Sequence, residues 1–89
     1  MRIIDVVKKI PRGKVASYAA VARAARTSPR AVGFVMRANR DPAVPCHRVV
    51  CSSGMPGGFN RGLEQKIALL KAEGIRIVKG RIGKKYLIA

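Results

Sequence analysis

The chain has 89 residues, in which 19 Lys and Arg face four Asp and Glu, for a formal net charge of +15. Hydrophobic residues make up 48% of the sequence, which excludes a charged disordered tail. A chain this short buries only about 60–65% of its unfolded surface, so we expect one domain over residues 1–89. The charge requires solvated cations or a polyanionic partner, and nucleic acid is the usual partner of a small basic domain.

Membrane and secreted classes fit the sequence poorly. No apolar run approaches the length of a transmembrane helix, and the first ten residues carry Asp5, Lys8 and Lys9, unlike a secretory signal. The basic residues are spread along the whole chain, which argues against a membrane partner. Two cysteines are too few for a disulfide framework. We therefore expect a cytoplasmic, nucleoid-associated protein whose thiols stay reduced.

The first third of the sequence predicts three short helices. Apolar residues recur at helical spacing at Ile3, Val6, Val7 and Ile10, and residues 11–13 end that helix. Residues 14–16 fit a strand or a loop. Ser17 is a good N-cap for a helix over 18–25, and Ser28 followed by Pro29 predicts a helix from 29 to about 38. Such a pair suggests a helix-turn-helix, although any three-helix bundle gives the same pattern.

The third predicted helix has two different faces. One carries Val32, Val35, Met36 and Asn39, and the other carries Arg30, Gly33, Phe34 and Arg37. Glycine inside a helix costs about 1 kcal/mol relative to alanine. Gly33 therefore indicates that another group approaches the backbone closely, and tight helix–helix packing is the simplest explanation.

The second half begins with an irregular stretch. Pro42 and Pro45 predict extended or irregular backbone over 39–51, and 52–58 is a Gly/Ser/Pro loop. Asn60 can cap a further helix whose buried stripe is Leu63, Ile67 and Leu70, and which stops at Gly74. Residues 75–78 and 84–88 are predicted to pair as a small hairpin.

Cys46 and His47 are the candidates for chemistry. Cysteine attacks as the thiolate, which Arg48 and the general positive field would favour, and His47 could take the proton directly or through a water. Such a base needs an orienting partner, and Glu73 is one of only four acids that could serve. Local chemistry leaves two interpretations open: a catalytic pair, or a packed thiol beside a surface histidine.

Other roles for the two cysteines are weaker. Cys46, His47 and Cys51 would give a metal three ligands, two of them adjacent, which lacks the spacing of a structural zinc site. We expect no metal. A Cys46–Cys51 disulfide could form under oxidation, but the reducing cytoplasm argues against it as the working form.

The segment Pro45-Cys46-His47-Arg48-Val49-Val50 resembles the active-site signature of the O6-alkylguanine-DNA alkyltransferases, also called methylated-DNA–protein-cysteine methyltransferases. Further matches follow in the family's order over roughly residues 3–77. They are residues 10–15 with Ser17-Tyr18, Arg30-Ala31-Val32-Gly33, Met36-Arg37-Ala38-Asn39, Ser52-Ser53-Gly54, Gly62-Leu63, Lys66 and Leu70-Lys71-Ala72-Glu73-Gly74.

The resemblance implies a mainly α fold, a winged helix-turn-helix DNA-binding domain with short strands and a wing, and a repair protein without a cofactor. Cys46 would attack the alkyl carbon on guanine O6 and keep the alkyl group as a thioether, so that each molecule reacts once. His47 would deprotonate Cys46 through a water, and Glu73 would hold His47. Asn39 would support the active-site loop, and Tyr18 would donate a proton toward guanine N3.

The same resemblance implies a partner, double-stranded DNA containing O6-alkylguanine, bound in the minor groove with the damaged nucleotide flipped out. Arg30 would fill the vacated space, while Ala31 and Gly33 let the helix approach the groove. Arg37 and Lys66 would support phosphate contact or the local structure. Ser52 belongs to the DNA-binding set at the pocket edge, and the pocket itself is assigned to Met36, Val49, Cys51 and Asn60.

The chain also departs from the family pattern. The family's usual N-terminal domain is missing from this sequence, which leaves open a fusion to, or an association with, another repair protein. We expect a monomer. Asn39 lies one residue closer to Cys46 than usual, and the stretch from Tyr18 to Arg30 is about two residues shorter.

Two alternatives stay open: a non-catalytic alkylguanine-binding relative, which commonly has tryptophan in place of Cys46, and a winged-helix factor without chemistry.

Overall fold

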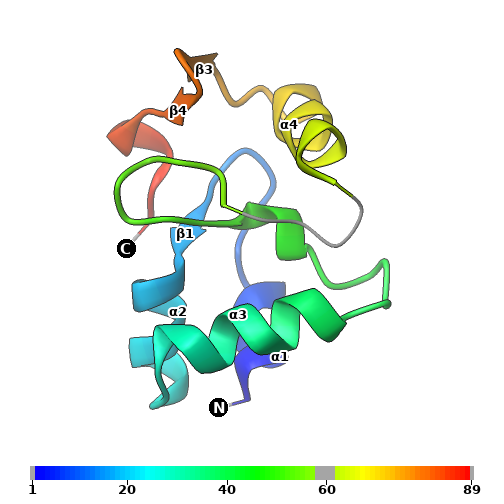
Figure 1. Cartoon of the computed structure of the whole chain (residues 1–89), viewed down its shortest axis with the longest axis vertical. Coiled ribbons are helices and arrows are strands. Elements are labelled where there is room, and N and C mark those ends of the chain that lie inside the picture. The colour runs from blue at the N-terminus through cyan, green and yellow to red at the C-terminus, as the bar shows by residue number, and fades with distance from the viewer. Residues whose placement is uncertain (1, 58–61, 89) are drawn as a thin grey trace.

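Short helices dominate the chain, with small strand pairs between them (Figure 1). The computed structural model describes residues 2–57 and 62–88. Its α-helices are α1 (Ile3–Lys8), α2 (Tyr18–Ala25), α3 (Pro29–Ala38) and α4 (Leu63–Ala72). Its strands are β1 (Ala16–Ser17), β2 (Val49–Val50), β3 (Ile77–Val78) and β4 (Arg81–Ile82), and its 3-10 turns are η1 (Cys46–Arg48) and η2 (Lys84–Tyr86). The predicted mainly α domain with short strands is confirmed.

Two serine caps set the starts of α2 and α3. Ser17 Oγ accepts the amide of Ala20 at 3.0 Å, and Ser28 Oγ accepts the amide of Ala31 at 3.1 Å. Each bond satisfies an amide that the first helical turn leaves without a partner. Pro29 occupies the first position of α3, where its missing N–H has no consequence. The predicted bounds of both helices, and the tight turn between them, are confirmed.

The three N-terminal helices pack into one apolar cluster. Val7 of α1, Val21 of α2, and Val32 and Met36 of α3 are buried together in it. Helix α1 ends at Lys8, before the predicted stripe is complete, but Ile10 is still buried in the same cluster. This cluster gives the α2–turn–α3 pair a fixed support, seen in the lower half of Figure 1.

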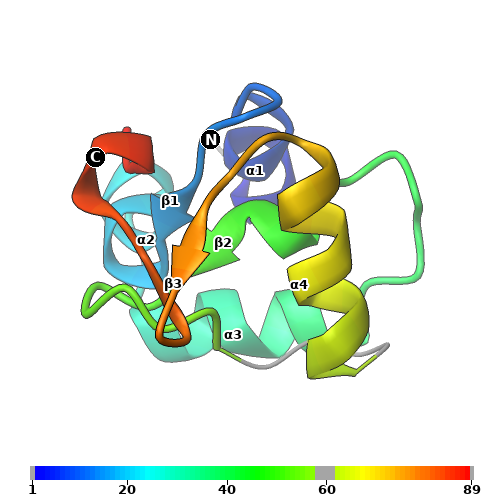
Figure 2. The same cartoon turned by 90° about the horizontal axis from the view of Figure 1, so that it is seen from above.

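A parallel pair of strands joins this helical unit to the middle of the chain. Ala16 pairs with Val49, and Ser17 pairs with Val50. In Figure 2, β2 lies between β1 and α4. Since α2 starts directly after β1 and η1 ends directly before β2, the pairing brings Tyr18 toward the segment of Cys46. Of residues 14–16, for which a strand or a loop was expected, only Ala16 belongs to strand β1.

The C-terminal hairpin differs from its prediction. Strand β3 pairs with β4, Ile77 opposite Ile82 and Val78 opposite Arg81, whereas residues 84–88 were expected as the partner. The reason is the turn: Lys79 and Gly80 both have positive φ, at 52° and 76°, which is the backbone of a two-residue hairpin turn. The second strand therefore begins at once, and residues 84–86 form η2 instead.

The predicted buried stripe of α4 is correct at Leu70, while Ile67 is half-buried and Leu63 is wrong. Leu63 is 50% exposed, while Lys66 and Leu70 are fully buried. Lys66 lies outside the predicted stripe but points inward, because its ammonium donates to the Val49 carbonyl of strand β2 at 2.8 Å. The helix begins after Gly62 at φ 97°, and the predicted cap at Asn60 lies outside the described residues. Within residues 2–57 and 62–88, no helix has the length and apolar character needed to cross a membrane.

Candidate active site and DNA-facing helix

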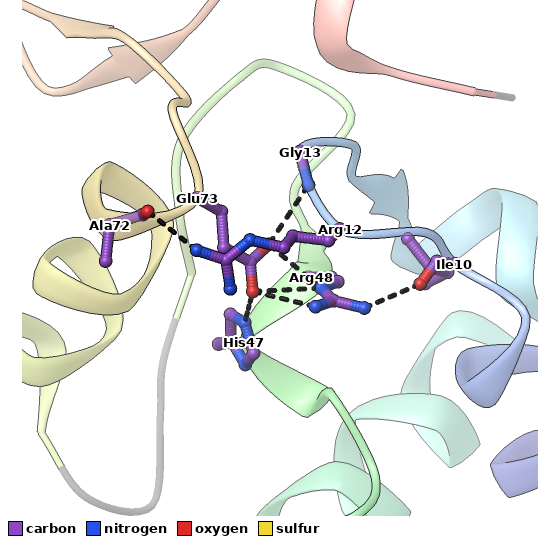
Figure 3. Close-up of polar contacts among 7 residues, drawn as sticks. All are labelled: Ile10, Arg12, Gly13, His47, Arg48, Ala72 and Glu73. Atoms are coloured by element: carbon purple, nitrogen blue, oxygen red, sulfur yellow. Dashed lines mark hydrogen bonds and ion pairs between the residues drawn. The ribbon is translucent and has the colours of Figure 1, made fainter.

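Glu73, the C-cap residue that directly follows α4, lies at the centre of a polar cluster (Figure 3). Its Oε2 is 2.7 Å from His47 Nε2, and the two side chains are only 5% and 14% exposed. A carboxylate can only accept, so Nε2 carries the proton and Nδ1 is left to act as a base. The expected contact between Glu73 and His47 is present.

Arg48 holds the same carboxylate from another side. Its Nη2 donates to Oε2 of Glu73 at 2.8 Å and its Nε donates to Oε1 at 2.9 Å, while Nη1 donates to the Ile10 carbonyl at 2.8 Å. The Gly13 amide adds a longer bond to Oε1 at 3.3 Å. Figure 3 shows these bonds joining α4 to the segment between α1 and β1. Arg48 was expected to favour the thiolate, but its charge is paired with Glu73.

These bonds decide the charge state of Glu73. Burial by itself would raise the pKa of this carboxyl, but the hydrogen bonds from Arg48, His47 and the Gly13 amide outweigh burial and lower the pKa to about 2. Glu73 is therefore an anion at neutral pH, and it stabilises positive charge on the His47 ring.

Cys46 starts η1 directly after Pro45 and is 9% exposed. The Asn39 amide nitrogen lies 3.8 Å from Sγ of Cys46 and also donates to the Asp41 carbonyl at 3.2 Å. The Asp41 amide in turn donates to Oδ1 of Asn39 at 3.2 Å. Asn39 thus connects the end of α3, the following loop and the thiol. Its expected part in supporting the active-site loop fits these contacts, despite the shortened spacing to Cys46.

Lys66 occupies the interior of the site. Its Nζ lies 5.8 Å from the centre of the Tyr18 ring and is bonded to the Val49 carbonyl. Burial lowers the pKa of Lys66 to about 8, and the thiols of Cys51 and Cys46 act in the opposite direction. A phosphate contact by Lys66 is ruled out by its full burial, so support of the local structure is its role in this fold. The sequence did indicate that Lys66 lies on the side of the site, because Lys66 and Glu73 are seven residues apart and share one helix face.

Tyr18 and Cys51 lie against one loop. A Cβ placed on Gly57 would be 3.3 Å from the Tyr18 hydroxyl and 3.4 Å from Sγ of Cys51, so the loop passes close to both side chains. Burial raises the pKa of Tyr18, as do the nearby thiols of Cys51 and Cys46, while Arg37 lowers it. The hydroxyl therefore remains a proton donor through the neutral pH range.

The predicted pocket positions divide into two groups. Met36 and Val49 are buried in the helical cluster with Cys46, and Ser52 is exposed. The backbone groups of the pocket residues Val49 and Cys51 have partners within the chain: Val49 C=O accepts from Lys66, and the Cys51 amide donates to the Met55 carbonyl at 2.9 Å. Asn60, also assigned to the pocket, lies outside the described residues.

The outer face of α3 carries the remaining predicted DNA contacts. Arg30 and Arg37 are exposed, and Ala31 is half-buried. A Cβ on Gly33 would have no atom within 4 Å in the described part of the chain. The prediction of tight helix–helix packing at Gly33 is wrong, because this glycine faces away from α1 and α2. The open backbone at Gly33 is instead free to approach an external partner.

Comparison with known proteins decides the family. Residues 1–75 match the model of the family described as the 6-O-methylguanine DNA methyltransferase, DNA binding domain. The chain belongs to this family. Methylated-DNA–protein-cysteine methyltransferases of Sulfolobus acidocaldarius and Methanocaldococcus jannaschii are 44% and 38% identical to it, over 85% and 96% of its length. It covers 49% and 51% of those proteins, so this methyltransferase-family domain spans about half the length of these curated relatives.

Solved structures agree with this assignment. The domain superposes on the O6-methylguanine-DNA methyltransferase of Pyrococcus kodakaraensis with a TM-score of 0.77 and 44% identity, covering 82% of this chain and 44% of the other. It superposes on Mycobacterium tuberculosis OGT in complex with DNA at 0.78 and 36% identity, covering 82% and 46%. The structure of S. pombe Atl1 in complex with damaged DNA containing O6-carboxymethylguanine gives a TM-score of 0.84 at 28% identity, covering 99% of this chain and 92% of the other.

Proposed function

We propose that this domain repairs DNA by moving the alkyl group of O6-alkylguanine onto Sγ of its own Cys46. The observation that carries the proposal is the 2.7 Å contact between His47 Nε2 and Glu73 Oε2. His47 directly follows Cys46 in the sequence. A histidine whose one nitrogen is held by an anion is a base with a defined free nitrogen. Membership of the methyltransferase family supports the same chemistry.

The proposed reaction is a single displacement. His47 takes the Cys46 proton through a water, and Glu73 stabilises the resulting imidazolium. The thiolate attacks the alkyl carbon in line with the bond to O6, so that an S–C bond forms as the C–O6 bond breaks. Guanine leaves with the bonding electron pair, and Tyr18 supplies a proton toward N3. A thioether has no easy leaving path, so each molecule reacts once and needs no cofactor.

The proposed partner is double-stranded DNA. The net charge of +15 and the exposed arginines of α3 favour a polyanion. Because O6 is inaccessible in the base stack, the nucleotide must be flipped out, and we assign Arg30 to the vacated space in the minor groove. We propose that the domain acts as a monomer on nucleoid DNA in the cytoplasm.

Binding of alkylguanine without transfer is the second candidate. It is favoured by the superposition on S. pombe Atl1, a structure solved with damaged DNA, at a TM-score of 0.84. Cys46 with the His47–Glu73 pair argues for transfer, because binding alone has no need of a base held beside a thiol.

The deciding experiment weighs the intact protein after incubation with an oligonucleotide that contains O6-methylguanine. We expect one methyl group to replace the thiol proton in the wild type and in Cys51→Ala, and no gain in Cys46→Ala. A wild type that binds the lesion tightly without gaining mass would establish the binding-only candidate. Arg30→Ala tests flipping: transfer should slow more with duplex than with single-stranded substrate, and equal slowing would contradict the role given to Arg30.

A further inference from the structure

Phe34, in the middle of α3, is the most exposed of the large hydrophobic side chains in the described residues, at 72%. Removing it would cost the fold little, because most of the ring already contacts water. Single exposed apolar residues are common in soluble proteins. The position of Phe34 on its helix makes this one informative.

Phe34 stands between two exposed arginines on one helix face. Arg30, Phe34 and Arg37 follow at intervals of four and three residues, which places them in one row along α3. Gly33, in the same stretch, leaves the backbone open on its outer side. The helix contains no acidic residue. This row of Arg30, Gly33, Phe34 and Arg37, the α3 ridge, is cationic, with one aromatic ring at its middle.

We propose that Phe34 is an apolar wedge that enters the DNA minor groove one helical turn from Arg30 and contacts deoxyribose and base edges there. This inference rests on the function proposed above. Arginines alone would serve for phosphate contact, whereas the groove interior presents apolar sugar and base surface that a phenyl ring can cover. Proteins that bind the minor groove use Phe in this way to unstack a base step.

The spacing of the ridge fits two neighbouring points in one groove. Four helical residues rise about 6 Å, and base pairs follow one another at about 3.4 Å along the duplex. With Arg30 at the flipped nucleotide, Phe34 therefore reaches a base step about two pairs away. The charge of the ridge favours DNA over a protein partner, because its two flanking cations would need acidic partners on a protein surface.

The test compares Phe34→Ala, Phe34→Trp and a control, Val78→Ala. Val78 is also apolar and exposed, at 56%, but it lies in β3 at the opposite end of the molecule from α3 (Figure 1). Affinity is measured by fluorescence anisotropy on a duplex containing O6-methylguanine, at several salt concentrations. We expect Phe34→Ala to bind about tenfold more weakly, in line with the loss of one aromatic contact to nucleic acid. Phe34→Trp and Val78→Ala should bind like the wild type.

Two further readouts separate a wedge from an electrostatic contact. The dependence of affinity on salt should be the same in Phe34→Ala as in the wild type, because no phosphate contact is lost, whereas Arg37→Ala should reduce the slope. A 2-aminopurine two pairs from the lesion should brighten when the wild type binds, and less so with Phe34→Ala. Circular dichroism and thermal melting show whether the variants fold.

The outcomes are distinct. If the wild type accepts the methyl group and binds the duplex while Phe34→Ala binds equally well, the wedge is wrong and the repair function stands. That result would indicate that the exposed Phe34 ring contacts a protein partner instead of DNA. If the wild type neither binds the lesion duplex nor gains mass, the proposed function fails, and the wedge fails with it.

Discussion

The guanidinium of Arg48 binds the Glu73 carboxylate through two nitrogens and still reaches the Ile10 carbonyl with its third, at 2.8 Å. One side chain thereby connects η1, the end of α4 and the segment that follows α1. Bidentate pairs of this kind fix orientation as well as charge. His47, the proposed base, is consequently held by a carboxylate whose orientation Arg48 fixes.

Replacing Arg48 tests this connection. We expect Arg48→Met to lower the free energy of unfolding by about 3 kcal/mol, because it leaves a largely buried carboxylate with one strong partner fewer. The control is Arg12→Met, which loses only an exposed bond to the Ala72 carbonyl and should cost about 0.5 kcal/mol. Urea unfolding measures both, and equal losses in the two variants would contradict the role of Arg48.

Acid should remove the contribution of Glu73. Its pKa is about 2 in the folded protein against an ordinary value of 4.5, so the folded state binds this proton less readily than the unfolded chain. The stabilisation is therefore complete above about pH 4.5 and is lost as pH falls toward 2. Glu73→Gln lacks this carboxyl, so its stability deficit relative to the wild type should shrink over that range. A constant deficit would show that Glu73 does not contribute through its charge. At neutral pH the same variant should transfer methyl more slowly.

Lys66 predicts a second pH dependence, at the alkaline end. Its pKa is lowered from 10.5 to about 8 by burial, so between these values the folded protein gives up a proton that the unfolded chain keeps. Stability then rises with pH, at most by about 1 kcal/mol per pH unit from this group. In Lys66→Met this part of the rise should be absent. Parallel curves for the two proteins from pH 8 to 10 would contradict a buried, charged Lys66.

Two glycines should respond to alanine in opposite ways. Gly33→Ala meets no neighbour within 4 Å in the described residues and lies inside a helix, so it should raise stability by about 1 kcal/mol. Gly54→Ala would place a Cβ 2.9 Å from the Ile82 carbonyl at a φ of 94°, and should cost about 3 kcal/mol. Thermal melting compares them. A loss of stability in Gly33→Ala would show that the backbone there is not open.

The two serine caps allow a matched comparison. Ser17 is buried and Ser28 is exposed, although both bond an amide three residues on. Ser28→Ala should cost about 1 kcal/mol. Ser17→Ala should cost about 2 kcal/mol, because water cannot replace the lost bond at a buried amide. Equal costs in chemical unfolding would mean that burial of the cap does not matter.

Local signals made α2 and α3 predictable from the sequence. Ser17 and Ser28 act on amides three residues away, so the information for each helix start lies within one turn. Local chemistry made Cys46 and His47 candidates but left a packed thiol beside a surface histidine open, and it narrowed the partner of His47 only to four acids. The sequence resemblance pointed to catalysis and to Glu73.

The features that the sequence did not predict depend mostly on contacts between segments that are distant in the chain. The inward face of α4 depends on the Val49 carbonyl, 17 residues from Lys66, and no apolar pattern encodes that bond. Arg48 finds Ile10 at a separation of 38 residues, so its charge could not be assigned from its neighbours in the chain. The hairpin was mispredicted for a local reason, since Lys79 is not a residue that usually adopts positive φ.

The bridge between Val15 and Leu87 bears on how the protein is made. Val15, directly before β1, donates to the Tyr86 carbonyl and accepts from the Ile88 amide, so its backbone bonds form only after residue 88 has left the ribosome. Such distant pairings slow folding, because the entropy of closing a long loop is lost before the stabilising contacts form. A nascent chain that has emerged as far as residue 62 would already carry Cys46 but would lack Lys66 and Glu73. Translation therefore produces Cys46, the proposed acceptor, well before Lys66 and Glu73.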